Sequence, residues 1–259
     1  MPESKNYHGT YAYKTDIGRV RKTNEDRAII LMNSDNEVFL AVSDGMGGSE
    51  KGDVASKLTI DLLNASFKKK KKHRYLFSDK RWITRTCKSI NKKIYSMAEK
   101  VNKTEKNSEK IGMGCTLVAV LISGERMMIA NIGDSRAYML KDGEIKQLTT
   151  DQTYVEYLLK TGKITEEGAK THPDRHVLTN ALGVYNSLSL SIADRPYHGE
   201  SILLCSDGLY NNLDSKEIAN ILLTDERTDQ KVVSLISIAN HAGGSDNIGI
   251  ALWECIAND

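Results

Sequence analysis

Residues 36–48 read NEVFLAVSDGMGG, in which an apolar run at 38–42 is followed by a serine, an aspartate and a glycine-rich end. Aromatic and β-branched residues in the run predict a buried strand, and residues 44–48 predict a glycine-rich loop at its end. A second apolar segment, residues 26–33 (DRAIILMN), precedes it across a Ser-Asp turn. The two segments together predict a pair of strands joined by that turn.

Outward from this hairpin, strands follow strands and helices follow helices. Apolar residues at helical spacing predict helices over residues 51–67, 80–101, 214–223 and 228–242, and a mostly polar helical insert over about 151–175. Short β-rich runs predict strands over 115–122, 126–132, 137–140, 144–148, 188–192, 201–205 and 247–254. This order favours an α+β fold, in which antiparallel sheets are covered by helices, over alternating βαβ units.

The composition is that of an ordinary globular protein. Of the 259 residues, 40% are hydrophobic and 27% charged, which excludes disordered and fibrous classes. The 36 Lys and Arg against 34 Asp and Glu leave a net charge of +2, so no global polycation is available to bind nucleic acid. The length by itself allows one large domain or two small ones.

Three features predict a cytoplasmic location. The opening residues, MPESKNYHGT, contain neither the basic nor the apolar region of a signal peptide. The longest apolar stretch, residues 115–122, is far shorter than the roughly 20 residues of a membrane-spanning helix. The four cysteines, at positions 87, 115, 205 and 255, form no CxxC motif, so we expect buried free thiols in a reducing compartment.

Residues 68–72 are five consecutive lysines between two predicted helices. Such a run could contact RNA or anionic lipid. The alternative is a solvated loop between the helices. No aromatic residue interrupts the lysines, and this favours the solvated loop over a nucleic-acid site.

Acidic residues recur where apolar runs end, often next to glycine. Asp44 follows VFLAVS, Asp134 follows MIANIG, and Asp207 follows ILLCS. Each alone is typical of a turn. The recurrence favours a cleft at the sheet ends, where converging carboxylates would repel one another unless a cation neutralised them. The same set includes three acids that precede strands, namely Asp246, Glu25 and Asp26.

This ligand chemistry favours a hard divalent cation. Oxygen ligands without His or Cys are typical of Mg²⁺ or Mn²⁺ rather than zinc, and Gly45 lets its own carbonyl approach an ion. Two such ions about 3.5 to 4 Å apart can share a carboxylate and hold a hydroxide for in-line attack on phosphorus. A nucleotide-binding loop is disfavoured, because DGMGG has neither the GK[ST] of a P-loop nor the spacing of GxGxxG.

Eight segments then match the motifs of one family, in family order and over nearly the whole chain. They are GRVRKTNED (18–26), VSDGMGGSEKGDVAS (42–56), GCT (114–116), ANIGDSRAY (130–138), LTTD (148–151), HVLTNALG (176–183), LLCSDGL (203–209) and GGSDN (243–247). Together they resemble the metal-dependent Ser/Thr protein phosphatases of type 2C, the PPM family, in their compact bacterial form.

The resemblance implies a fold and a domain plan. The fold would be a central sandwich of two antiparallel β-sheets flanked by antiparallel helix pairs. Residues 151–175 would form a flap subdomain beside the cleft, which contributes substrate choice rather than metal binding. Because neither half of the chain carries a full set of motifs, residues 1–259 would form a single domain.

The resemblance also implies a centre of two metal ions, Mn²⁺ or Mg²⁺. Asp44 would bridge the two ions, with the Gly45 carbonyl on one of them. Asp207 and Asp246 would bind the other. As metal ligands, these four residues would form the centre of the site.

Three further acids and an arginine complete the implied site. Glu25 and Asp26 resemble the acids that hold metal-bound waters, and Asp134 resembles a ligand of a third, weaker metal. Arg21 resembles the arginine that grips the substrate phosphate, where a guanidinium fork suits two phosphate oxygens. Arg19 is a rival only two residues away, and both would point to one face if residues 15–21 were extended.

The activity that follows from the resemblance is metal-dependent hydrolysis of phosphoserine and phosphothreonine in proteins. A metal-bridging hydroxide would attack phosphorus directly, with Arg21, Asp44 and Asp207 as catalytic residues. Phosphorylated proteins and a Ser/Thr kinase, whose action is reversed, are the implied partners of a monomer that binds neither nucleic acid nor membrane. The alternative is a pseudophosphatase that binds phosphoproteins without turnover, whose signature would be a missing metal aspartate; none is missing here.

Four residues depart from the family pattern. Met46 stands where animal members carry a His proposed as general acid, so the donor to the leaving group is a metal-bound water or an unidentified acid. Gln152 replaces a His, Asn180 replaces a basic residue, and Gly249 replaces Thr or Ser. None of the four is an implied metal ligand, so we expect these departures to affect flap docking and substrate preference more than catalysis.

Overall fold

The computed structural model describes residues 7–47, 51–70, 76–104 and 112–256. Gly48 of the predicted glycine-rich loop, and Lys71 and Lys72 of the lysine run, lie outside these ranges. The strands form two sheets in which every strand pairing is antiparallel.

The first sheet has the order β1-β11-β10-β7-β8. Its strands are β1 (Gly9–Asp16), β11 (Ile248–Cys255), β10 (Ser201–Cys205), β7 (Arg136–Lys141) and β8 (Glu144–Gln147). The second has the order β2-β3-β5-β6-β9, with a short β4 paired to the end of β3. Its strands are β2 (Asp26–Met32), β3 (Val38–Met46), β4 (Gly114–Cys115), β5 (Leu117–Ser123), β6 (Arg126–Ile132) and β9 (Ser191–Pro196).

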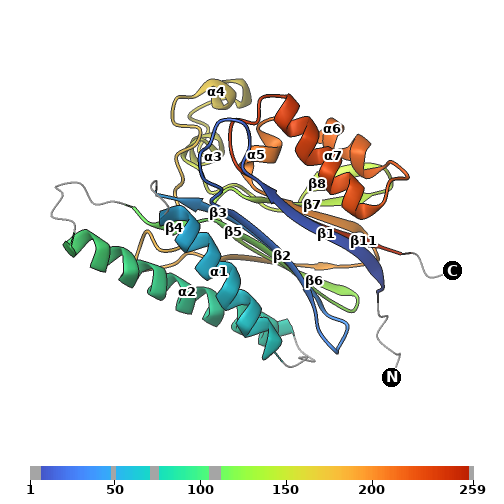
Figure 1. Ribbon diagram of the computed structural model, residues 1–259, viewed down its shortest axis with the longest axis horizontal. Coiled ribbons are helices and arrows are strands. Elements are labelled where there is room, and N and C mark those ends of the chain that lie inside the picture. The colour runs from blue at the N-terminus through green and yellow to red at the C-terminus, as the bar shows by residue number, and fades with distance from the viewer. Residues whose placement is uncertain (1–6, 48–50, 71–75, 105–111, 257–259) are drawn as a thin grey trace.

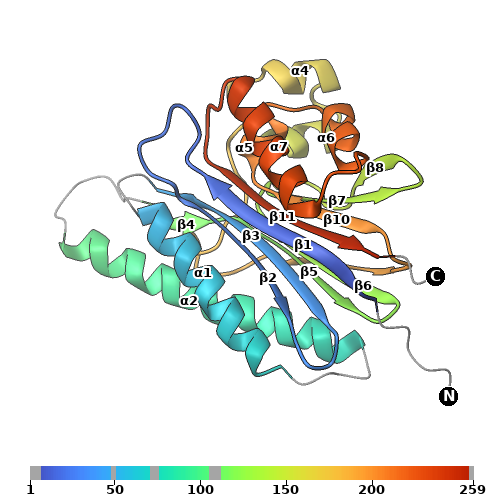
Figure 2. The same ribbon diagram turned by 45° about the vertical axis from the view of Figure 1, so that its right-hand side comes forward.

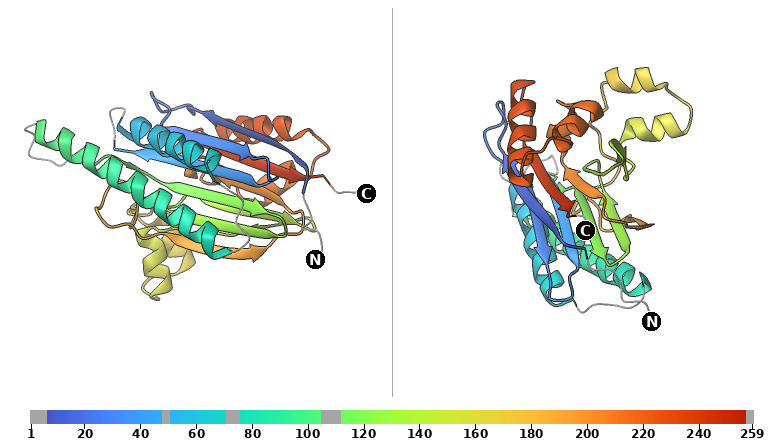
Figure 3. Two further views of the ribbon diagram at one scale, coloured as in Figure 1. Left: turned by 90° about the horizontal axis from the view of Figure 1, so that it is seen from below. Right: turned by 90° about the vertical axis from the view of Figure 1, so that its right-hand side faces the viewer.

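Helices cover the outer faces of both sheets (Figures 1 and 2). The pair α1 (Lys51–Lys68) and α2 (Leu76–Thr104) lies on the second sheet, and α5 (Asp207–Tyr210), α6 (Ser215–Leu222) and α7 (Thr228–His241) lie on the first. The short helices α3 (Tyr154–Lys160) and α4 (Glu166–Thr171) stand out at one end (Figure 3). The predicted sandwich of two antiparallel sheets flanked by helices is therefore confirmed.

The alternation of side chains along β3 shows how the three-layered core arises. Phe39 and Ala41 point to the helix pair, where Phe39 stacks on Phe67 of α1. Leu40 and Val42 point between the sheets, in the same cluster as Trp253. Because both faces of β3 are covered, the strand is an unbroken apolar run.

The glycine-rich segment is mostly strand rather than loop, which corrects the prediction for residues 44–48. β3 continues to Met46, because Gly45 and Met46 pair with Cys115 and Gly114 of β4. Gly45 is needed there, since a Cβ on it would lie 2.3 Å from the carbonyl oxygen of Gly52 at the start of α1. Asp44 is thus held within a ladder instead of on a flexible turn.

Two strands differ from the sequence prediction. β1 was not predicted, because its residues GTYAYKTD are partly exposed and lie at a sheet edge, where β11 supplies the only ladder. The strand expected over residues 188–192 lies at 191–196 instead. Leu188 and Leu190 pack against the α1–α2 layer as covering loop residues, so their apolar character does not mark a strand.

The lysine run is neither a solvated loop nor a free basic patch at Lys70. Its side chain is fully buried, and Nζ lies 2.8 Å from both carboxylate oxygens of Glu37 and 3.0 Å from Oδ1 of Asp79. We call Glu37, Lys70 and Asp79 the Lys70 cluster. The cluster joins the end of α1 to the β2–β3 hairpin and to the start of α2. Because its side chain is buried in these contacts, Lys70 is not available to RNA or lipid.

Two other expectations concern cysteines and hydrophobic helices. All four cysteines are free, and Cys87, Cys115 and Cys205 are buried while Cys255 is partly exposed. Over the described residues, the chain contains no helix with both the length and the apolar character that a membrane crossing requires.

Candidate active site

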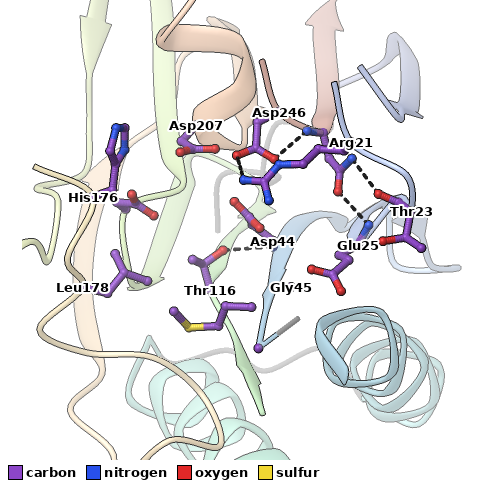
Figure 4. Close-up of a pocket in the computed structure, with 14 residues that line it drawn as sticks. Arg21, Thr23, Glu25, Asp44, Gly45, Thr116, His176, Leu178, Asp207 and Asp246 are labelled. Atoms are coloured by element: carbon purple, nitrogen blue, oxygen red, sulfur yellow. Dashed lines mark hydrogen bonds and ion pairs between the residues drawn. The ribbon is translucent and has the colours of Figure 1, made fainter. Parts of the chain in front are cut away.

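A pocket of about 280 Å³ lies where the ends of both sheets meet (Figure 4). It is bounded by β3, the β1–β2 loop, Asp134 between β6 and β7, the start of α5 and the two residues before β11. Of the predicted site residues, all but Asp26 line it: Arg21, Glu25, Asp44, Gly45, Asp134, Asp207 and Asp246. We call Glu25, Asp44, Asp134, Asp207 and Asp246 the pocket carboxylates.

Backbone hydrogen bonds with Thr116 hold Asp44 in place. The Asp44 amide donates to Thr116 Oγ1 at 3.0 Å, and the Thr116 amide donates to the Asp44 carbonyl at 2.8 Å. Thr116 Oγ1 also lies 2.6 Å from the Ser135 hydroxyl, next to Asp134. The GCT segment therefore joins Asp44 on β3 to the β6–β7 connection that carries Asp134.

Asp26 lies behind the pocket instead of in its lining. It is the ladder partner of Asp44 and is fully buried. Ser206 donates to its Oδ2 at 2.6 Å, while its Oδ1 has no hydrogen-bond partner. A Cβ at Gly249 would lie 3.2 Å from Asp26 Oδ2, so this departure from the family pattern makes room beside Asp26 and does not touch the flap.

Arg21 enters the pocket, and Arg19 does not. The segment 15–21 is not extended, because β1 ends at Asp16 and Gly18 turns the chain with a φ of +80°. The Arg19 amide donates to the Gly244 carbonyl, which fixes the turn. Arg21 Nη2 lies 2.6 Å from Asp246 Oδ2, so the two form an ion pair at the pocket wall.

Asn247 and His176 also contribute to the pocket, although the sequence pointed to them only as members of quoted motifs. Asn247 accepts from the Glu25 amide at 2.8 Å and donates to the carbonyls of Ile17 and Thr23 at 2.9 Å. It thereby shapes the β1–β2 loop. His176 lies on the segment that returns from the flap, and Figure 4 places it across the pocket from Arg21.

The pocket carboxylates are electrostatically unfavourable as charged groups. Burial, followed by repulsion from neighbouring carboxylates, raises the pKa of Asp44 and of Asp207 well above the usual range. Burial raises the pKa of Asp134 to about 6 and that of Asp26 to about 7. A group of acids with raised pKa values in one pocket is typical of a functional site.

The residues present fit a divalent cation. Buried oxygens of Glu25, Asp26 and Asp207 have no hydrogen-bond partner, and hard oxygen donors suit Mg²⁺ or Mn²⁺. In the part of the chain that the structure describes, no three His, Cys, Asp or Glu side chains lie close enough together to hold a metal ion as they stand. The acids line a shared pocket instead, and one of them is paired with Arg21.

Two of the four departures from the family pattern meet at the base of the insert that carries α3 and α4. Asn180 Nδ2 donates to Gln152 Oε1 at 2.6 Å, and the amide of Gly133, next to Asp134, donates to the same oxygen at 2.9 Å. The Thr179 amide adds a bond to the Gln152 carbonyl. The two residues therefore complement each other, and they join both ends of the insert to the end of β6.

Comparisons with known proteins agree with this fold and this pocket. The family model described as Protein phosphatase 2C matches residues 19–243. The serine/threonine phosphatase Stp of Listeria monocytogenes is 37% identical over 243 residues, which cover 93% of this chain and 94% of that protein. The chain therefore belongs to the protein phosphatase 2C family, and the expectation of a protein-serine/threonine phosphatase is confirmed.

Solved structures are similar over the same length. The serine/threonine phosphatase of S. agalactiae superposes with a TM-score of 0.87 at 32% identity, covering 95% of this chain and 99% of that one. The catalytic domain of the phosphatase PstP, solved in complex with two manganese ions, superposes with a TM-score of 0.79 at 31% identity, covering 96% and 99%.

Proposed function

We propose that this protein hydrolyses phosphoserine and phosphothreonine in proteins with two divalent cations, Mn²⁺ or Mg²⁺, and a third held through Asp134. The observation that carries the proposal is the set of pocket carboxylates beside one arginine: the pKa values of Asp44 and Asp207 are raised, and buried oxygens of Glu25 and Asp207 have no hydrogen-bond partner. The manganese ions in the related PstP domain support the choice of metal.

The carboxylates divide between the cations. Asp44 would lie between two of them with the Gly45 carbonyl on one, and Asp207 and Asp246 would bind the other. Glu25 lines the pocket and Asp26 lies directly behind Asp44, so these two would act through water. When bound, the cations would neutralise the carboxylates, polarise the phosphate and lower the pKa of the water that attacks phosphorus.

Arg21 has the charge and the position to hold the substrate phosphate. Only one of its nitrogens is bonded to Asp246, and the side chain is more than half exposed. The remaining N–H donors of the guanidinium fork can bind two phosphate oxygens. If Asp246 turns to a cation, Arg21 loses its present partner and is free to bind phosphate.

The cellular setting that we propose follows from the same activity. The substrates would be the phosphorylated targets of a Ser/Thr kinase, in a signalling role in the cytoplasm. We further propose a monomer that acts as a single domain over residues 1–259, in which residues 151–175 serve as a flap that selects substrates. No nucleic-acid or membrane partner is needed.

The test is turnover by the purified protein. With Mn²⁺ it should hydrolyse p-nitrophenyl phosphate and a phosphothreonine peptide, and EDTA should abolish both reactions. Asp44→Asn and Asp207→Asn should each lower kcat by about 10³-fold or more, because each removes charge that holds cations at the reacting phosphate. Mn²⁺ binding, measured by calorimetry, should weaken in both variants.

A matched control is Asp61→Asn, which removes an exposed aspartate from α1 and should leave turnover unchanged. The proposal fails if the unmodified protein shows no metal-dependent turnover of either substrate. The metal assignments fail if both pocket variants keep their activity and their affinity for Mn²⁺.

A further inference from the structure

The pocket has a proton donor suited to a leaving alkoxide, and Met46 is not that donor. Met46 lines the pocket, but a thioether has no proton to give. Hydrolysis of a phosphoserine or phosphothreonine breaks a bond to an alkoxide, which is a poor leaving group unless it is protonated. The reaction therefore calls for an acid elsewhere in the pocket.

Most of the polar side chains in the lining are excluded by their present bonds or their chemistry. The Thr116 hydroxyl is bonded to the Asp44 amide and to Ser135. Arg21 does not release a proton in proteins, and the ion pair with Asp246 raises its pKa further. The pocket carboxylates would be occupied as metal ligands under the proposed function.

The remaining side chain that can release a proton near neutral pH is His176, the only imidazole among the residues that line the pocket in the described chain. It is exposed, so it stands at the rim where a protein substrate would enter. Figure 4 shows Arg21 on the other side of the pocket, with Asp44 and Asp207 between them. In-line displacement puts the leaving oxygen on the side of phosphorus away from the attacking water, and therefore toward the rim.

We propose that His176 is the catalytic acid that protonates the leaving serine or threonine oxygen. This inference rests on the proposed function. As a water oxygen bonds to phosphorus, the bond from phosphorus to the side-chain oxygen breaks, and that oxygen takes a proton from a ring N–H of the imidazolium. The water's proton passes to solvent, and the neutral imidazole regains its own proton from solvent, so the products are phosphate and the free hydroxyl.

The surroundings of His176 are consistent with this role. Burial, followed by the neighbouring Arg175, lowers the pKa of His176, and Asp246 opposes the shift. An imidazolium with a lowered pKa is a stronger acid. His176 also lines the neighbouring cavity of about 400 Å³ between the flap and α5, so it separates the catalytic pocket from a space where the rest of a protein substrate could lie.

The experiment compares leaving groups. A phosphothreonine peptide leaves as an alkoxide and needs an acid, whereas p-nitrophenolate is stable as an anion and needs little help. In His176→Gln with Mn²⁺, kcat on the peptide should fall by about 10²-fold or more, and kcat on p-nitrophenyl phosphate should fall far less. Across a series of aryl phosphates, the loss should grow as the leaving group becomes more basic.

The matched control is His172→Gln, four residues earlier in the same segment. His172 does not line the catalytic pocket and accepts a hydrogen bond from the Asp174 amide instead. Its kcat on both substrates should stay near that of the unmodified protein.

Three results would overturn the proposal. They are equal losses of kcat on the two kinds of substrate, a change confined to KM for the peptide, and no loss at all. Melting curves of His176→Gln check that the variant is folded. Failure of the proposed function itself is separate, because it would appear as absence of metal-dependent turnover in the unmodified protein.

Discussion

Two groups of acids, one near each end of β3, differ in how their negative charge is compensated. Glu37, just before the strand, receives Lys70 on both oxygens, Ser123 on Oε1 and Asn33 on Oε2. Asp44 lies near the other end, about 23 Å away along the strand, and burial, followed by repulsion from neighbouring carboxylates, raises its pKa. The first group is neutralised by a cation of the chain, whereas in the second the ion pair of Arg21 with Asp246 leaves Asp44 and Asp207 with raised pKa values.

This difference distinguishes a group of acids that stabilises the fold from a group that is suited to a functional site. A buried carboxylate is costly unless it is paired, so a fold that needs only stability supplies the partner itself, as the Lys70 cluster does. Where the partner must come from solution, the cost remains in the folded chain as raised pKa values and unpartnered oxygens. The pocket is therefore the part of the molecule that metal should stabilise.

The largest expected effect on stability comes from removing the internal cation. Lys70→Met keeps the length of the side chain but leaves Glu37 buried without its cation and Asp79 with the more distant Arg126, whose Nη2 lies 3.5 Å from Asp79 Oδ2. The free energy of unfolding should fall by about 3–5 kcal/mol, as in other broken buried pairs. Urea unfolding measures this loss, and kcat of the folded variant should change little because the Lys70 cluster is remote from the pocket.

The control is Lys69→Met, at the exposed preceding residue, whose free energy of unfolding should change by no more than about 0.5 kcal/mol. If Lys70→Met lowered the free energy of unfolding as little as Lys69→Met does, the Lys70 cluster would not stabilise the fold and the contrast with the pocket would disappear.

Unlike the Lys70 cluster, the pocket should make the free energy of unfolding depend on pH and on bound metal. In EDTA, Asp26 with a pKa of about 7 and Asp134 with a pKa of about 6 keep protons that the unfolded chain, with ordinary aspartate values, has already released. Between about pH 4 and 7 the folded state thus binds more protons, so stability falls as pH rises. From pH 5.5 to 7.5 we expect a loss of about 2 kcal/mol.

Urea unfolding at the two pH values, with EDTA and with Mn²⁺, measures this dependence. Mn²⁺ should remove most of the loss, because a bound cation replaces the protons. Asp26→Asn should reduce the loss in EDTA, since an amide has no proton to release. Stability that rises with pH in EDTA would mean that the pocket carboxylates are already compensated within the chain.

The sequence predicted the pocket well because its signals are local. Asp44, Asp134 and Asp207 each follow an apolar run, so the end of each strand could be predicted without knowing its neighbours. The structure brings them together because antiparallel strands of both sheets end at the same edge. Arg21 could be separated from Arg19 only by the family pattern, since the turn at Gly18 depends on Gly244, far along the chain.

The features that the sequence missed depend on distant partners. Nothing near Lys70 distinguishes it from the lysines beside it, because its burial is set by Glu37, 33 residues earlier. β1 exists as a strand because β11 pairs with it, and its own residues are too polar to predict that. His176 is a candidate acid because the fold places the segment after α4 opposite Arg21, and no local sequence signal shows this.

The smallest expected effect on stability comes from removing one serine hydroxyl at each end of β3. Ser123 donates to Glu37 Oε1 at 2.9 Å, and Ser206 donates to Asp26 Oδ2 at 2.6 Å. In Ser123→Ala, Glu37 keeps Lys70, so the free energy of unfolding should fall by only about 1 kcal/mol. That loss should be the same at pH 5.5 and 7.5 and unaffected by Mn²⁺.

Ser206→Ala should behave differently, because its hydrogen bond lowers the pKa of a carboxyl that lacks a protein cation. At pH 5.5 in EDTA that carboxyl is mostly protonated and the loss is small, whereas at pH 7.5 the charged form has lost its donor and the loss is larger. Urea unfolding of both variants at both pH values tests this. Equal pH responses would show that hydrogen bonds, rather than the missing cation, distinguish the two ends of β3.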